Sequence, residues 1–216
     1  LAPQNLLIIW LVFPIVKLFH ELGHAYAVKR WGGEVHQIGV MLLVLTPVPY
    51  VDASAASVFR ERWKRALVGA AGMMAEGLLA AIALFVWLQV EPGLVRLICF
   101  NVMLIAGVST LLFNGNPLLR FDAYYILADL IEIPNLANRA NRYIFYLIQR
   151  YLYGMKRAES PVLARGERAW FSFYAIGSFV YRMFIYVFIT TFVAGKFFVI
   201  GIILSCLLYT SPSPRD

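Results

Sequence analysis

The chain alternates long apolar runs with short polar segments, and each run has the length of a membrane-spanning helix. A helix that crosses the hydrocarbon core needs about 20 mostly apolar residues. Runs of this kind cover residues 6–27, 66–90, 94–113 and 170–193, and another starts near residue 197. The pattern therefore predicts an all-α membrane fold, a multi-pass helical bundle.

One segment between the first two runs does not read as a helix. Residues 32–45 are rich in Val and Ile and punctuated by Gly, and residues 46–50 contain two prolines. Gly and Pro at such positions disfavour a helix. We expect a membrane-embedded β-hairpin or re-entrant segment between the first and second core helices. Because lipid does not tolerate an open strand edge, this segment must lie against protein.

The third run also carries a predicted break. Apolar residues continue beyond it through Gly115 and Pro117 to about Ile133, which is too long for one straight span. Residues 135–154 place several arginines among aromatic residues, and we expect them to form an amphipathic helix in the membrane interface.

Composition and charge support a membrane protein. The 216 residues are 61% hydrophobic and 14% charged, whereas soluble domains are about 45–50% apolar and about 25% charged. The net charge is +7, but the basic residues lie between the apolar runs, so membrane topology explains them and no nucleic-acid partner is expected. Lys and Arg concentrate in residues 29–65 and 120–168, which we expect to be cytoplasmic.

We expect residues 1–205 to form a single membrane-embedded domain that is truncated at both ends. Residues 206–216 resemble the translation of a sequencing adapter, so we leave them out of the fold prediction. The two cysteines do not suggest a disulfide framework.

The first apolar run contains the candidate chemistry, the segment His20-Glu-Leu-Gly-His24. Two histidines four residues apart share one helix face and can bind one zinc ion. Glu21 is then placed to take a proton from water at the metal. Polar groups inside a lipid-facing run are costly and indicate function; the alternative is a polar patch paired with other helices. His20 lies about 21 Å along a helix that starts at Leu6, toward the cytoplasmic side.

A catalytic zinc site usually has a third protein ligand in addition to water. Arg30 stands where one soluble class of zinc proteases has its third histidine, so that class is excluded. His36, the remaining histidine, lies near the predicted hairpin and is a poor candidate. A carboxylate is the better one.

At this point the sequence resembles the site-2 protease family of intramembrane zinc metalloproteases. The family's motif Asn-x-x-Pro-x-x-x-Leu-Asp-Gly aligns without a gap with residues 114–123, except that Ala123 replaces the final Gly. The resemblance implies that Asp122 is the third ligand of one zinc ion per chain. It also implies that the predicted hairpin holds an unwound substrate. If the chain is a protease, we expect Asn114 to hydrogen-bond the scissile carbonyl or its oxyanion. The alternative for Asp122 is a helix N-cap.

A second resemblance lies in the next core helix. Ala71-Gly-Met-Met-Ala-Glu76 is similar to the family's Ala-Gly-Pro-x-x-Asn motif, and its small residues permit close helix approach. Glu76 is either a partner of the metal site or a buried acid paired with Arg182. Residues 50–55, residues 116–122 and the pair Tyr181-Arg182 resemble a bacterial branch of peptide zinc metalloproteases, which implies the bacterial inner membrane.

Three functions are compatible with these residues. The first is an intramembrane zinc metalloendopeptidase that acts on membrane-associated proteins or peptides. The second is a non-catalytic, zinc-stabilised membrane component of a peptide maturation or export system, with an export partner. The third is a zinc transporter, which Asn114 and Asp122 fit poorly.

Overall fold

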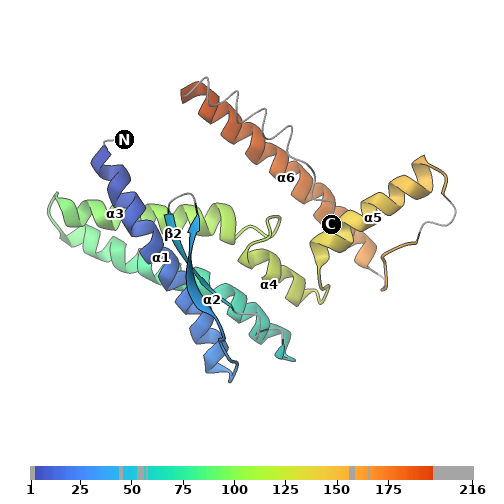
Figure 1. Cartoon of the computed structure of the whole chain (residues 1–216), viewed down its shortest axis with the longest axis horizontal. Coiled ribbons are helices and arrows are strands. Elements are labelled where there is room, and N and C mark those ends of the chain that lie inside the picture. The colour runs from blue at the N-terminus through green and yellow to red at the C-terminus, as the bar shows by residue number, and fades with distance from the viewer. Residues whose placement is uncertain are drawn as a thin grey trace. The chain divides into compact units, whose positions relative to one another are not determined.

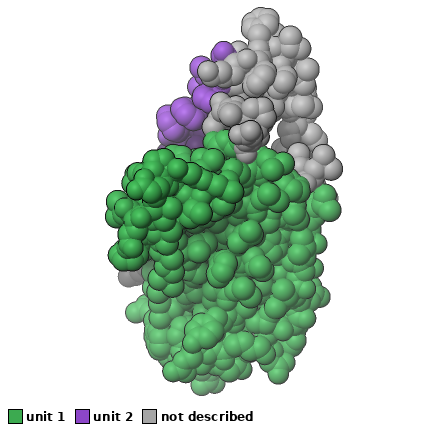
Figure 2. All heavy atoms as spheres, turned by 90° about the vertical axis from the view of Figure 1, so that its left-hand side faces the viewer, with its two compact units in different colours: residues 1–135 green, residues 136–216 purple. Residues whose placement is uncertain are grey.

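The computed structural model describes residues 3–43, 46–52, 56, 58–155, 159–164 and 166–196. The chain divides into two compact units, residues 1–135 and residues 136–216, coloured green and purple in Figure 2. The elements of the first unit are α1 (Pro3–Arg30), β1 (Ile38–Leu43), β2 (Thr46–Val51), α2 (Arg62–Gln89), α3 (Leu94–Val108), η2 (Ser109–Asn114) and α4 (Asp122–Leu130). Those of the second are α5 (Leu136–Leu147), η3 (Ile148–Leu152) and α6 (Glu167–Lys196).

Four helices are long and apolar enough to cross a membrane among the residues described. They are α1, α2, α3 continued by η2, and α6. Large apolar side chains cover their outer faces; Leu7, Leu78 and Phe85 are 61%, 65% and 66% exposed. Such surfaces need lipid around them. The predicted multi-pass membrane fold is confirmed, and the run predicted from residue 197 lies outside the described residues.

The predicted hairpin is also confirmed. Strands β1 and β2 pair antiparallel, with Ile38 opposite Val51 and Leu43 opposite Thr46. Helix α1 ends before them in a turn whose Gly32 has a φ of +77°, and the Gly33 N–H donates to the Val28 carbonyl at 3.0 Å. This left-handed glycine turn is a common helix C-cap. Strand β2 lies along α1 (Figure 1), so the hairpin is held against protein as expected.

Helix α2 is the centre of the first unit, because α1, α3 and α4 all pack against it (Figure 1). Two small apolar clusters hold the helices together. One contains Val12 and Val16 of α1 with Ala106 of α3, and the other contains Val28 of α1 with Val68 of α2. The break predicted after the third run is confirmed: the helical backbone stops at Asn114 and resumes in α4.

In the second unit, α5 packs on α6 through the apolar face that its sequence predicts. Leu136 and Ala140 are fully buried there, and Tyr143 lies 5.9 Å from Phe171 between ring centroids. Helix α5 is therefore amphipathic as expected; its location in the membrane interface stays a prediction.

Candidate metal centre

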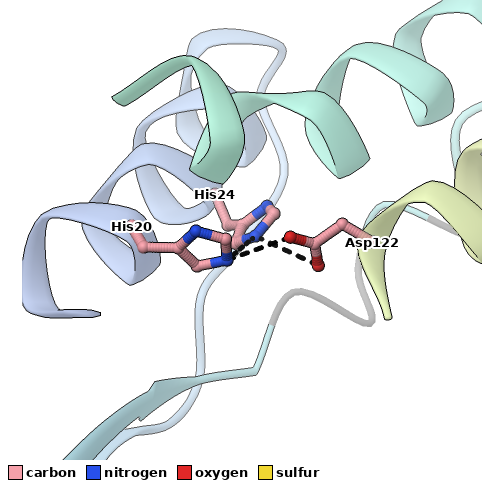
Figure 3. Close-up of side chains that lie close together, drawn as sticks. All are labelled: His20, His24 and Asp122. Atoms are coloured by element: carbon pink, nitrogen blue, oxygen red, sulfur yellow. Dashed lines mark hydrogen bonds and ion pairs between the residues drawn. The ribbon is translucent and has the colours of Figure 1, made fainter. Parts of the chain in front are cut away.

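Three side chains from distant parts of the first unit converge on one point (Figure 3). His20 and His24 come from α1 and Asp122 from the start of α4. The two histidine Nε2 atoms are 3.1 Å apart. Asp122 Oδ2 lies 3.0 Å from His20 Nε2, and Asp122 Oδ1 lies 3.6 Å from His24 Nε2. No other group of three or more His, Cys, Asp or Glu with this geometry occurs in the described part of the chain.

Two glycines allow α1 and α2 to pack closely enough for this convergence. Gly23 of α1 faces the backbone of α2, and a Cβ at this position would lie 2.6 Å from the Ala71 carbonyl oxygen. Gly72 of α2 faces the two histidine rings, and a Cβ there would lie 2.6 Å from His20 Cε1. The absence of these two side chains lets the helices approach at the level of the histidines.

Each imidazole has an oxygen atom near its Nδ1, on the side of the ring that faces away from the candidate metal position. The Nδ1 atom of His24 lies 2.7 Å from the Val68 carbonyl oxygen. Because a carbonyl only accepts, Nδ1 carries the proton and the Nε2 lone pair faces the site. The Nδ1 atom of His20 lies 3.3 Å from Glu76 Oε1. Acceptors of this kind orient metal-binding histidines.

Asp122 reaches the site because the chain breaks between η2 and α4. It is the first residue of α4, and the N-cap position is Phe121, which makes no side-chain cap hydrogen bond. The carboxylate therefore points to the histidines rather than capping the helix. Ala123, which replaces the family's glycine, lies within α4 and has no positive φ, so its Cβ causes no backbone strain.

The donor set fits a zinc ion. A tetrahedral zinc with bonds of about 2.0–2.1 Å keeps its ligand atoms about 3.3 Å apart. The two histidine Nε2 atoms are 3.1 Å apart and Asp122 Oδ2 lies 3.0 Å from His20 Nε2, and one ligand atom from each of the three residues lies within 4.8 Å of the other two. Asp122 Oδ2 is also buried without a well-aligned hydrogen bond. Burial alone would raise the pKa of the Asp122 carboxyl, but the adjacent imidazoles of His20 and His24 outweigh it and lower that pKa below its usual range. The ionised form is the one that binds metals.

Glu21 lies beside this group at the wall of a cavity of about 600 Å³. The cavity is also lined by His24, Asp122 and Val51. The Val51 N–H, at the end of β2, donates a hydrogen bond to Glu21 Oε2 at 3.1 Å. The space next to the three candidate ligands is therefore bordered by an acid and by the end of the hairpin.

Asn114, the last residue of the π-helix η2, is buried. Its Nδ2 atom has no hydrogen-bond partner within the described structure. A buried amide N–H without a partner is costly and calls for an explanation such as a ligand. The π-helix itself is a geometry that is often found at functional sites.

The structure decides two questions that the sequence left open. His36 is exposed and lies 3.8 Å from Glu34, away from the metal group. Glu76 contacts His20 and pairs with Lys17 at 2.7 Å. The alternative partner, Arg182, donates its Nε–H to the Ser178 carbonyl in the other unit.

Several contributors to the site were missed in the sequence. Lys17 had a signal, because it stands in an apolar run three residues before His20 and so lies on the same helix face. The Val68 carbonyl and the Val51 N–H are backbone groups, which no side-chain pattern can reveal.

Comparison with known proteins agrees with the motifs. The model of peptidase family M50 matches residues 8–210. No curated protein and no solved structure matches the chain. The family match confirms the resemblance to site-2 proteases and spans both the His20–His24 segment and Asp122.

Proposed function

The chain belongs to peptidase family M50, a family of membrane metalloproteases, and we propose that it is an intramembrane zinc metalloendopeptidase. One observation carries the proposal: His20, His24 and Asp122 present their metal-binding atoms to one another within 4.8 Å, next to a cavity that also contains Glu21. Its substrates are membrane-associated proteins or peptides.

His20, His24 and Asp122 would hold the zinc ion. When bound, zinc supplies a Lewis acid that lets water lose a proton near neutral pH. Glu21 is the group that accepts this proton and later delivers it to the leaving amine. Its hydrogen bond from Val51 holds the carboxylate at the wall of the cavity.

Asn114 is the proposed donor for the substrate carbonyl. Its unpartnered Nδ2–H would donate to the oxygen on which negative charge develops as the peptide bond breaks. Removal of one such donor from a protease typically lowers kcat by about 10²–10³-fold.

The hairpin provides a surface for an extended substrate. The Asp52 N–H donates toward β1, whereas the Val51 N–H points the opposite way, toward Glu21. Backbone groups alternate along a strand, so the nitrogens of Pro47 and Pro49 share the side of Val51. Since proline has no N–H, this edge of β2 offers carbonyl acceptors, and its N–H at Val51 already donates to Glu21. We propose that the substrate donates its own N–H groups to this edge.

We place the chain in a bacterial inner membrane with the site toward the cytoplasm. Lys29 and Arg30 form the last turn of α1, close to His24, and basic residues are retained on the cytoplasmic side. A Glu34→Cys variant in inverted vesicles should react with a membrane-impermeant thiol reagent. Reaction in intact spheroplasts would place the site on the opposite side.

The decisive test compares Glu21→Gln with wild type after reconstitution with zinc. Both proteins should contain one zinc, and the wild type should cleave members of a pool of single-span peptides, as read by mass spectrometry. Glu21→Gln should cleave none of them, while the exposed Glu34→Gln variant should behave as wild type. Undiminished cleavage by Glu21→Gln would refute the role of Glu21, and a zinc-loaded wild type without any cleavage would favour a non-catalytic component.

A further inference from the structure

A group of polar side chains is buried behind His20, between α1, α2 and η2. Glu76 of α2 is fully buried, and its Oε1 atom accepts a hydrogen bond from Lys17 Nζ at 2.7 Å. Its Oε2 atom accepts one from Thr110 Oγ1 at 2.6 Å. Lys17 also donates to Ser109 Oγ. Lysine and glutamate inside membrane helices are costly and are associated with function.

This group touches the candidate metal centre at one atom. Glu76 Oε1 lies 3.3 Å from Nδ1 of His20, while Nε2, across the same ring, lies 3.0 Å from Asp122. Nδ1 is buried and makes no well-aligned hydrogen bond.

The contacts of Glu76 fix where its oxygens point. Thr110 holds Oε2 and Lys17 approaches Oε1, so the carboxylate cannot rotate away from His20 without losing a hydrogen bond. The positive charge of Lys17 balances the carboxylate, which would otherwise be costly to bury. The arrangement keeps an acceptor aimed at the ring nitrogen that does not face the metal.

We propose that Glu76 is a positioning residue: it holds the His20 imidazole with Nδ1 protonated and Nε2 toward the metal, and Lys17 is its permanent counter-ion. The inference rests on the proposed role of His20 as a zinc ligand. It gives His20 an oxygen acceptor on the Nδ1 side of the ring, as the Val68 carbonyl does for His24. Through Thr110 the same carboxylate also fixes the start of η2, the π-helix that ends at Asn114.

The test uses the full chain in detergent and separates positioning from charge balance. The variants are Glu76→Gln, Glu76→Leu and the double variant Glu76→Leu with Lys17→Met. Asn101→Leu is the matched control, because Asn101 is fully buried, bonds to Asn5 at 2.9 Å and has no contact with the metal group among the described residues. The readouts are the zinc dissociation constant by chelator competition, the Tm, and the visible spectrum of the cobalt-substituted protein.

Loss of such an acceptor weakens metal binding by about 10–100-fold. We expect a loss of this size in Glu76→Leu and a smaller one in Glu76→Gln, whose amide oxygen still accepts from Nδ1. The double variant should recover the Tm of wild type, because no unpaired charge remains, but not its zinc affinity or its cobalt spectrum. Asn101→Leu should keep the zinc affinity and the cobalt spectrum of wild type.

Two results would overturn the inference. A double variant that binds zinc as tightly as wild type would show that Glu76 only balances Lys17. A double variant that melts as low as Glu76→Leu would show that the network is needed for the fold itself. Absence of zinc from the wild type is a separate outcome, which would refute the proposed function first.

Discussion

Replacement of Gly72 by alanine tests the close packing on which the metal centre depends. The added Cβ would lie 2.6 Å from His20 Cε1, while carbon atoms in good contact are about 3.5 Å apart. The overlap is therefore about 0.9 Å, and the same methyl group would also meet His24 Nε2. Since His24 is bonded to the Val68 carbonyl, its ring cannot turn away freely.

Overpacking of this kind costs about 1–3 kcal/mol. Without metal, the rings can move aside and relieve the clash, whereas the metal-bound state needs both rings in place. The cost should therefore appear as weaker zinc binding, by about 5–150-fold at about 1.4 kcal/mol for each factor of ten. The assay is chelator competition for zinc in detergent.

Gly77→Ala is the matched control for this variant. Gly77 lies in the same helix, and nothing lies within 4 Å of a Cβ built there. Both substitutions gain about the same helix propensity, so the difference between them isolates the contact with the histidines. Equal zinc affinities of Gly72→Ala and Gly77→Ala would refute the packing argument.

The other predictions concern single contacts. Asp122→Ala should weaken zinc binding by at least about tenfold. Asp129→Ala should bind zinc as wild type does, because Asp129 lies in the same helix α4 but bonds to Arg65 of α2. Unchanged zinc content in Asp122→Ala would exclude this third ligand. Asn114→Ala should keep zinc but lower kcat by about 10²–10³-fold, and an unaltered kcat would remove Asn114 from the mechanism. Gly23→Ala should destabilise the fold by about 1–3 kcal/mol, read as a lower Tm, because its Cβ would meet the backbone of α2.

The helices and the hairpin were predictable because their signals are local. An apolar run of about 20 residues has few alternatives to a membrane helix. Gly and Pro between such runs indicate a turn or a non-helical segment. The helix start predicted at residue 66 was four residues late, because the basic residues Arg62, Lys64 and Arg65 hide the first turn of α2 from an apolar pattern.

The candidate site was predictable only in part. His20, Glu21 and His24 lie in one short segment whose helical spacing brings the two histidines to one face. Asp122 came from a family motif and not from any local rule, since the chain between His24 and Asp122 is long. Glu76 was identified as a polar residue in an apolar helix. The sequence did not distinguish a contact with the metal site from an ion pair with Arg182.

The sequence by itself determined that this is a membrane protein and that it carries a metal-binding motif. Both depend on composition and on short-range spacing, which do not require the fold to be known. The tertiary structure alone decided which atoms meet: Asp122 with the two histidines, Glu76 with His20 and Lys17, and Val51 with Glu21. These contacts arise where α1, α2 and α4 approach across Gly23 and Gly72, and the geometry of such an approach depends on how whole helices pack.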